Sequence, residues 1–230
     1  MSNDDEKIAA ARASVRFVND GDIVGLGSGS TASYAIRFLA ERVQAGLKIR
    51  GIPTSARTAT LAESLGIPLT TLDEFPEIDV DIDGADEVDA HLNLIKGGGG
   101  ALLREKVIAS ASRKLIIVVD SSKQVPVLGK FPLPVEVIAF AESVVARKIA
   151  ALGATVNIRL LKDGTPFVTD EGHHILDCRF GEIPQPSALA QALQAIPGVA
   201  GHGLFVNMAS VALIARGDQV QELKREEHAK

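Results

Sequence analysis

The chain has 230 residues, of which 46% are hydrophobic and 23% are charged, and its net charge is -5. This composition is ordinary for one or two folded domains and excludes disorder over most of the length. The acidic balance, the lack of tryptophan and the single tyrosine argue against a nucleic-acid partner. No apolar run reaches the roughly 20 residues that a membrane span needs.

The cysteine content and the N-terminus favour a reducing compartment. Cys178 is the single cysteine, which excludes an intramolecular disulfide framework, and no cluster of cysteine and histidine has zinc-site spacing. Residues 1–6 are acidic and lack the basic and apolar regions of a signal peptide. We therefore expect a cytoplasmic protein in which Cys178 is a small core residue.

The first half of the chain alternates between helix and strand patterns. Apolar residues recur at helical spacing from about residue 4 to residue 18, and Asp4 and Asp5 are placed to cap the start. Further strands are expected at 22–26, 47–52, 67–70, 79–82 and 114–119, and further helices at 31–43, 55–65 and 101–111. Such alternation predicts a mostly parallel sheet that is covered by helices.

A domain boundary is expected at residues 131–134, where two prolines among four residues (FPLP) stop both helices and central strands. Beyond it, residues 131–203 are expected to form a small α+β domain, with strands at 135–138, 154–160 and 174–177 and helices at 141–152 and 187–195. Short apolar strands at 203–206, 211–215 and 219–223 return to the first sheet. The larger domain would therefore comprise residues 1–130 and 204–230.

A loop rich in glycine and serine, GLGSGST at residues 25–31, joins the first expected strand to a helix. Such a turn leaves backbone N–H groups free at the positive end of a helix dipole, where they bind anions. Ser28, Ser30 and Thr31 add hydroxyl donors. The spacing does not fit a dinucleotide fingerprint, since residue 30 is a serine, and no P-loop lysine follows. The alternative is a tight turn in which Ser30 caps the helix, and the loop alone does not decide.

An acidic loop, DGADE at residues 83–87, follows another expected strand. The carboxyl end of that strand would deliver Asp83 and Asp86 into the crevice where open α/β sheets bind ligands. Two carboxylates in one cleft often have pKa values that are pushed apart, which suits proton transfer. The alternatives are a solvated turn in which Asp86 and Glu87 cap a helix, and a Mg²⁺ site.

A lysine and four glycines form the third motif, Lys96 and residues 97–100. Consecutive glycines are unfavourable in backbone entropy, so they indicate close approach of the backbone to a ligand. Lys96 is placed to polarise a carbonyl group or to neutralise an enediolate. If a helix begins at Ala101, Glu105 lies about one turn in and faces back towards the loop, while its basic neighbours point elsewhere. A flexible hinge beside a charged helix face is the alternative, but it does not explain the glycines.

The remaining candidates are a lysine and three histidines. Lys123 follows the expected strand at 114–119 and would project into the same crevice, although a surface lysine is the commoner outcome. His173 and His174 are adjacent, so on a strand they point to opposite faces and cannot share a metal. His91 lies close in sequence to the acidic loop, where a contact with a substrate is one interpretation and a surface position is the commoner outcome.

Taken together, these motifs resemble the type A family of ribose-5-phosphate isomerases. The resemblance is carried by GLGSGST at 25–31, DGADE at 83–87, KGGGGALLREK at 96–106, SKQ at 122–124 and LGKFPLPVEV at 128–137. It extends over nearly the whole chain. The lysine–glycine motif and the run ending at Val137 are specific, whereas the first loop is shared with coenzyme A transferases and sugar-phosphate-sensing regulators. Ser28 stands where threonine is common, and the hydroxyl is retained.

The resemblance implies a Rossmann-like main domain with helices on both faces of the sheet, a smaller α+β domain, a homo-oligomer that is usually a dimer or tetramer, and no metal or organic cofactor. It also implies interconversion of D-ribose 5-phosphate and D-ribulose 5-phosphate in the non-oxidative pentose phosphate pathway. Glu105 would be the base that moves a proton between C2 and C1, Lys96 would stabilise the oxyanion, and Asp83 or Asp86 would handle hydroxyl protons and ring opening. The implied substrate contacts are Ser28, Gly29, Ser30, Thr31, Asp83, Gly84, Ala85, Asp86, Lys96, Gly97, Gly98, Gly99 and Lys123.

Two other functions remain open on the sequence. A non-catalytic sugar-phosphate sensor is one, but such regulators carry a DNA-binding segment, and here about one helix precedes the first strand. A transferase in which Glu105 accepts an acyl group is the other. Lys96 and Lys123 together favour a compact phosphosugar over an acyl substrate.

Overall fold

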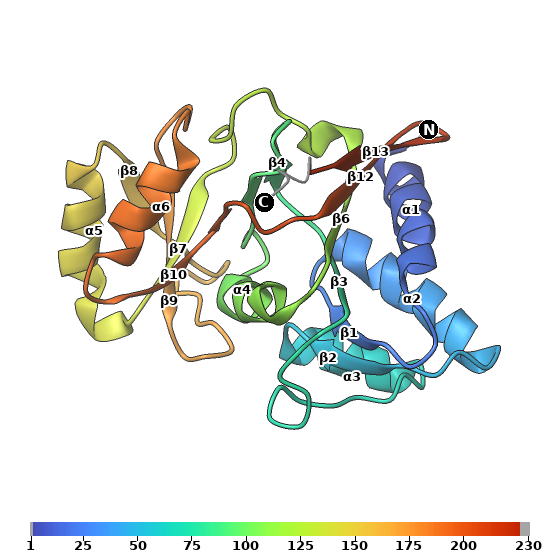
Figure 1. The fold of residues 1–230 in the computed structure, drawn as a ribbon. Coiled ribbons are helices and arrows are strands. Elements are labelled where there is room, and N and C mark those ends of the chain that lie inside the picture. Colours follow the sequence, from blue (N-terminus) through green and yellow to red (C-terminus); the bar gives the residue numbers. More distant parts are fainter. Residues whose placement is uncertain (1, 226–230) are drawn as a thin grey trace, which may run out of the picture.

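A six-stranded sheet forms the centre of the larger part of the protein (Figure 1). The structure is a computed structural model that describes residues 2–225. The strands are β1 (Ile23–Leu26), β2 (Arg50–Pro53), β3 (Val80–Asp83), β6 (Leu115–Asp120), β12 (Val211–Arg216) and β13 (Gln219–Lys224). Their order is β13-β12-β6-β3-β1-β2, and all neighbours are parallel except β12 and β13. The predicted mostly parallel sheet is thereby confirmed.

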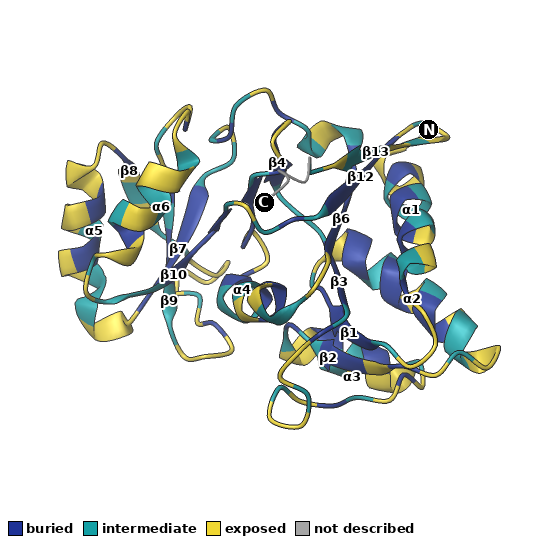
Figure 2. Ribbon diagram, viewed as in Figure 1, coloured by how far each residue is buried: buried dark blue, intermediate teal, exposed yellow. Residues whose placement is uncertain are grey.

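Helices cover both faces of this sheet, because its central strands are apolar on both sides. Every residue of β6 is buried, as expected for a parallel strand that is packed on two faces. Ile116 and Val118 join a core with α1 (Asn3–Ser14) and α2 (Ser30–Gln44), while Ile117 packs on the other side with α4 (Leu102–Ala111). A further helix, α3 (Ala56–Ser64), lies beside β2. Figure 2 shows the resulting dark band of buried strands.

A second, antiparallel sheet has the strand order β10-β7-β9-β8. Its elements are β7 (Leu133–Val137), α5 (Glu142–Ala151), β8 (Thr155–Ile158), β9 (His174–Arg179), α6 (Pro186–Gln194) and β10 (Val199–His202). Cys178 is fully buried in the core of this part, as expected. All these elements lie between residues 133 and 202, while the division into domains at 131 and 203 stays a prediction.

The strand expected at 203–206 does not return to the first sheet. The residues of this stretch that pair as a strand are β11 (Leu204–Phe205). This strand pairs with β5 (Leu94–Ile95), and β5 pairs in turn with β4 (Glu87–Val88). Glu87 therefore begins a strand and caps no helix. Strands of two residues have no periodicity from which a sequence pattern can assign them to a sheet. The strand expected at 67–70 is reduced to one bridge, between Gly51 and Leu69.

The N-terminal helix starts and ends differently from the sequence prediction. Ser2 is the cap: its side chain accepts from the backbone N–H of Asp5, and the Asp5 carboxylate accepts from the N–H of Ser2. Asp4 is an ordinary first-turn residue, because a capping residue needs the extended backbone that Ser2 has. The helix ends at Ser14, and a turn of 3₁₀ helix follows over Val15–Phe17. Among residues 2–225 no helix has the length and apolar character needed to cross a membrane.

Candidate active site

A cavity of about 230 Å³ opens where β1, β3 and β6 end. Parallel strands that end at one edge of an open sheet form the usual ligand crevice. The cavity brings together most of the predicted residues with several that were not predicted; its lining is Asn3, Lys7, Ser28, Gly29, Ser30, Thr31, Gly84, Ala85, Asp86, Lys96, Gly97, Gly98, Gly99, Glu105, Asp120, Ser122 and Lys123. Of the predicted residues only Asp83 is missing from this lining, because it lies buried behind the cavity wall.

Asp83 is the last residue of β3 and connects two of the loops. Its Oδ1 accepts from the N–H of Ser28 at 3.0 Å and from the N–H of Gly84 at 2.7 Å, while Oδ2 lies 2.9 Å from Nζ of Lys96. A Cβ atom at Gly27 would lie 2.3 Å from Oδ1, so glycine is required there. Burial raises the pKa of Asp83, and the Lys96 ammonium opposes that rise.

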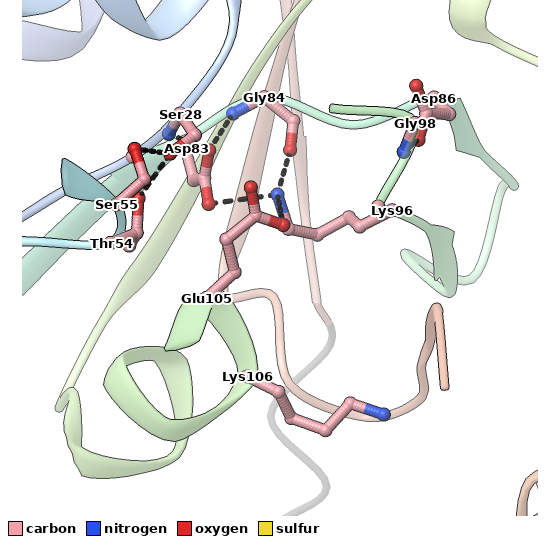
Figure 3. A network of polar contacts seen from close by, with 12 residues as sticks. Ser28, Thr54, Ser55, Asp83, Gly84, Asp86, Lys96, Gly98, Glu105 and Lys106 are labelled. Atoms are coloured by element: carbon pink, nitrogen blue, oxygen red, sulfur yellow. Dashed lines mark hydrogen bonds and ion pairs between the residues drawn. The ribbon is translucent and has the colours of Figure 1, made fainter. Parts of the chain in front are cut away.

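Lys96 follows β5 and is almost completely buried, with 3% of its side chain exposed. Its Nζ donates to the carbonyl oxygen of Gly84 at 2.5 Å and lies 3.3 Å from Oε2 of Glu105 (Figure 3). Burial by itself would lower the pKa of Lys96, but the carboxylates of Asp83 and Glu105 outweigh it and raise the pKa above its ordinary value. Lys96 is therefore a fixed ammonium at the cavity wall.

Glu105 lies in the first turn of α4 and faces the glycine loop, as predicted, while its neighbours Arg104 and Lys106 make contacts elsewhere. Its side chain is buried beside Lys96. Burial raises the pKa of Glu105 to about 8, with the Lys96 ammonium opposing and Asp83 adding to the rise. A carboxyl group with a pKa near neutrality, at the wall of a cavity, is suited to accept and return a proton.

A further carboxyl group, Asp81, lies two residues before Asp83 on β3 and was missed by sequence reasoning. The period of two along a strand puts both side chains on one face of the sheet. Asp81 is completely buried, and neither of its oxygens has a hydrogen-bond partner among residues 2–225. Burial, and then the charge of Asp83, raise the pKa of Asp81 well above its ordinary value. In the part of the chain that the structure describes, the ammonium group of Lys96 is thus the single positive charge that acts on three buried carboxyl groups, those of Asp81, Asp83 and Glu105. The three carboxyl groups cannot all be ionised, so some of them hold protons.

Asp86 has a different place from Asp83. It is half-buried and lines the cavity, where its Oδ2 accepts from the N–H of Gly98 at 2.7 Å. A Cβ atom at Gly98 would lie 2.6 Å from Oδ1 of Asp86, so this glycine permits the close approach. Asp86 therefore holds the glycine loop, while Asp83 pairs with the buried lysine.

The loop before α2 offers fewer hydroxyl groups than predicted. Gly29, with a φ of 94°, is the residue that caps α2, so Ser30 is the first helical residue and not the cap. The hydroxyl of Ser28 lies against three others, those of Thr54, Ser55 and Thr58. The Ser28 hydroxyl is therefore engaged within the protein, and the hydroxyl groups nearest the positive end of α2 are those of Ser30 and Thr31.

Two lysines, one predicted and one not, line the cavity together with the loop that precedes α2. Lys123 follows β6, and Lys7 comes from α1. The helix is anchored by Glu6, whose carboxylate accepts from Ser121 and Gly217. Lys7 was missed because a single lysine on an amphipathic helix carries no motif. Its pKa is raised, first by its hydrogen bond to Asp4.

Residues 2–225 contain no group of three or more histidine, cysteine, aspartate or glutamate side chains that is arranged to hold a metal ion. Beside Asp83 lies the ammonium group of Lys96, with Nζ 2.9 Å from Oδ2. The adjacent histidines do point apart: Nδ1 of His173 contacts Glu136 at 3.1 Å, and Nδ1 of His174 contacts Glu142 at 2.6 Å. Asp83 is thus paired with a lysine, and the two histidines contact separate carboxylates.

Comparison with known proteins shows what this arrangement is similar to. The family model described as "Ribose 5-phosphate isomerase A (phosphoriboisomerase A)" matches residues 50–219. The ribose-5-phosphate isomerase A of Brucella suis is 52% identical over 225 residues, which cover 95% of this chain and 97% of the relative. That of Sinorhizobium fredii is 56% identical over 214 residues, with 91% and 93% covered.

Two solved structures that are similar to this chain are, like the sequence relatives, ribose 5-phosphate isomerases. Ribose 5-phosphate isomerase A from Methanocaldococcus jannaschii superposes with a TM-score of 0.93 at 41% identity, covering 97% of this chain and 100% of that chain. A D-ribose-5-phosphate isomerase in complex with phospho-erythronic acid gives a TM-score of 0.95 at 37% identity, covering 98% and 100%. The similarity therefore extends over both sheets.

Proposed function

This chain belongs to the ribose 5-phosphate isomerase A family, and we propose that it interconverts D-ribose 5-phosphate and D-ribulose 5-phosphate through an enediolate. The observation that carries the proposal is the pair formed by Glu105 and Lys96. A carboxyl group with a pKa of about 8 lies 3.3 Å from a buried ammonium, and both line one cavity. The complex of a relative with phospho-erythronic acid supports a phosphosugar as the substrate.

In the proposed reaction, the Glu105 carboxylate removes the proton from C2 of the open-chain aldose. The C–H electron pair forms the C1–C2 double bond, and the former carbonyl electrons move to O1, where the Lys96 ammonium stabilises the negative charge. Glu105 then returns the proton to C1 as the carbonyl group forms at C2. Of the two aspartates expected to handle the hydroxyl protons and ring opening, Asp86 lines the cavity and takes this part, whereas Asp83 is buried behind the wall and acts through Lys96.

The phosphate group would be held at the start of α2. Backbone N–H groups of residues 29–31 and the hydroxyls of Ser30 and Thr31 supply uncharged donors at the positive end of the helix. Lys7 and Lys123 line the same cavity and supply the positive charge. This set explains how a chain with a net charge of -5 can bind a dianion by local geometry.

For the whole protein, we propose a homodimer that acts in the cytoplasm, in the non-oxidative pentose phosphate pathway. The family resemblance supports the oligomer. So do the exposed apolar side chains of Ile138, Phe140 and Val144 near the start of α5, which a second copy would cover. Light scattering on the purified protein distinguishes a dimer from a monomer or tetramer, and Phe140→Ser should weaken the association if this surface is the interface.

The experiment that tests the function is an assay of the purified protein with D-ribose 5-phosphate. We expect D-ribulose 5-phosphate to form, free ribose to be a very poor substrate, and a chelator to leave the rate unchanged. A sugar-phosphate sensor would instead bind the compound, as calorimetry would show, without converting it. Binding without turnover by the wild-type protein would contradict the proposal.

A further inference from the structure

The segment that joins β8 to β9, residues 159–173, reaches from the second sheet to the glycine loop and to the helices α3 and α4. Phe167 packs on the glycine loop so closely that a Cβ atom at Gly100 would lie 2.4 Å from its Cζ. Asp170 accepts from the N–H of Ala56 at the start of α3 at 2.8 Å. Arg104 pairs with Glu171. These contacts bring the second sheet to the wall of a site whose proposed catalytic residues all come from elsewhere.

Arg159, the first residue of this segment, contacts the glycine loop directly. Its Nη1 donates to the carbonyl oxygens of Gly97 at 2.9 Å and Gly98 at 3.1 Å. On its other side, Nε and Nη2 donate to the two carboxylate oxygens of Asp177 at 3.0 Å and 2.5 Å. The backbone N–H of Arg159 donates to Ile175 at 2.8 Å, and only 15% of the side chain is exposed. The guanidinium is therefore held rigidly from behind.

The two carbonyl groups determine where the next N–H groups point. In a planar trans peptide the C=O and N–H bonds are antiparallel. The peptide that carries the Gly97 carbonyl has its N–H on Gly98, which donates to Asp86. The peptide that carries the Gly98 carbonyl has its N–H on Gly99, and this group has no acceptor among residues 2–225. It must point away from Arg159, and Gly99 lines the cavity.

We propose that Arg159 is a positioning residue, which holds the glycine loop so that the N–H of Gly99 and the neighbouring Lys96 stay directed at the substrate. The inference rests on the proposed function of the cavity. Four consecutive glycines have more backbone freedom than any other sequence, and a donor that is misplaced by about 1 Å can reduce the rate about 10²-fold. An anchor outside the loop removes that freedom. On this account the second sheet contributes to the reaction through one side chain.

The test compares Arg159→Ala, Arg159→Lys and the matched control Arg147→Ala, which removes an exposed arginine from α5. We expect kcat of Arg159→Ala to fall about 10- to 100-fold with a much smaller change in KM, because the lost contact orders the loop and does not bind the phosphate. Arg159→Lys cannot serve two carbonyl groups and Asp177 together, so its kcat should also fall. Millimolar guanidinium, well below denaturing concentrations, should restore part of the kcat of Arg159→Ala.

Each outcome separates this inference from the proposed function. An inactive wild-type protein contradicts the function, whereas an active wild-type protein with Arg159→Ala within twofold of its kcat overturns only the role of Arg159. A loss of kcat without rescue, together with a lowered unfolding midpoint, overturns it as well, since that is the pattern of a structural residue. If Arg159→Ala does not fold, Arg159→Lys decides, and a normal kcat in that variant overturns the inference.

Discussion

Glu105 and Lys106 are consecutive residues of α4, yet their side chains point in different directions and into different surroundings (Figure 3). Glu105 faces the catalytic cavity and an ammonium group. Lys106 points away from the cavity, where Nζ donates to the carbonyl oxygens of His202 at 2.5 Å and Leu204 at 3.0 Å. The ring of Phe205 is near both lysines: its centre lies 5.5 Å from Nζ of Lys96 and 4.9 Å from Nζ of Lys106.

Burial acts on both groups in the same sense, because it disfavours the charged form of each. It raises the pKa of Glu105 to about 8 and lowers the pKa of Lys106 to about 7. Burial and the nearby Lys106 also lower the pKa of His202 to about 3, which keeps the imidazole neutral. A shifted pKa is thus not sufficient for catalysis. What distinguishes Glu105 is a cavity that can admit a substrate and a cation that can stabilise the charge formed there.

The largest difference between Glu105 and Lys106 should appear in the turnover number kcat. Glu105→Gln keeps the shape of the side chain and removes the base, so kcat should fall about 10²- to 10⁴-fold while substrate still binds. Lys106→Met keeps much of the volume and is the matched control; its kcat should change little. Steady-state kinetics of both variants test this contrast, and a near-normal kcat for Glu105→Gln would exclude it as the proton carrier.

Lys96→Met tests the cation on the catalytic side. Loss of an ammonium that stabilises the oxyanion should reduce kcat about 10²- to 10³-fold. Lys96 also holds down the pKa of Glu105, so its removal should raise that pKa further. Because the base must be ionised, the rise of kcat/KM with pH, which we expect near pH 8 in the wild-type protein, should move to higher pH. A rise at unchanged pH would show that the two groups are not coupled.

Ser30→Ala combined with Thr31→Ala should have a smaller effect, and of another kind. The double variant loses two hydroxyl donors and keeps the backbone donors and both lysines, so KM for ribose 5-phosphate should rise about tenfold or somewhat more. Because binding to the phosphate is equal in the ground and transition states, kcat should fall less than KM rises. Unchanged KM would place the phosphate elsewhere, with Lys123 the next residue to examine.

The smallest expected effect is on stability, because Glu105 and Lys106 change the free energy of unfolding with pH in opposite directions. Glu105 has an ordinary pKa of 4.5 and a folded pKa of about 8, so over that range the folded state holds a proton that the unfolded state has lost. The free energy of unfolding should fall as pH rises through this window. Lys106 has an ordinary pKa of 10.5 and a folded pKa of about 7, so between these values the unfolded state holds a proton that the folded state has lost. The free energy of unfolding should therefore rise with pH through that window.

Denaturation in urea at several pH values, between about 5 and about 10, measures both slopes. Glu105→Gln should flatten the fall in the free energy of unfolding, and Lys106→Met should flatten the rise. If both variants changed the same window in the same direction, the opposite signs assigned to the two sides of α4 would be wrong.

Sequence patterns predicted the parts of the candidate site that lie at the ends of buried strands. Lys123 could be placed because the strand before it has a clear apolar run, Asp83 because it ends a short buried strand, and residues 97–100 because four consecutive glycines need a reason. Lys7 and Arg159 could not be found this way, since each is a single basic residue whose importance depends on a contact distant in sequence. The direction of the Ser28 hydroxyl likewise depends on Thr54, Ser55 and Thr58, which belong to the next strand and helix.

The central claim, that Glu105 carries the proton between C2 and C1, is tested most directly by isotope exchange. Ribose 5-phosphate is incubated in heavy water with the wild-type protein or with Glu105→Gln, and proton NMR follows the signal of the hydrogen on C2. The wild-type protein should remove this signal, because Glu105 either carries the C2 hydrogen to C1 or exchanges it for deuterium from the solvent, and Glu105→Gln should leave it in place although the substrate still binds. Loss of the C2 signal at the wild-type rate in Glu105→Gln would contradict the account.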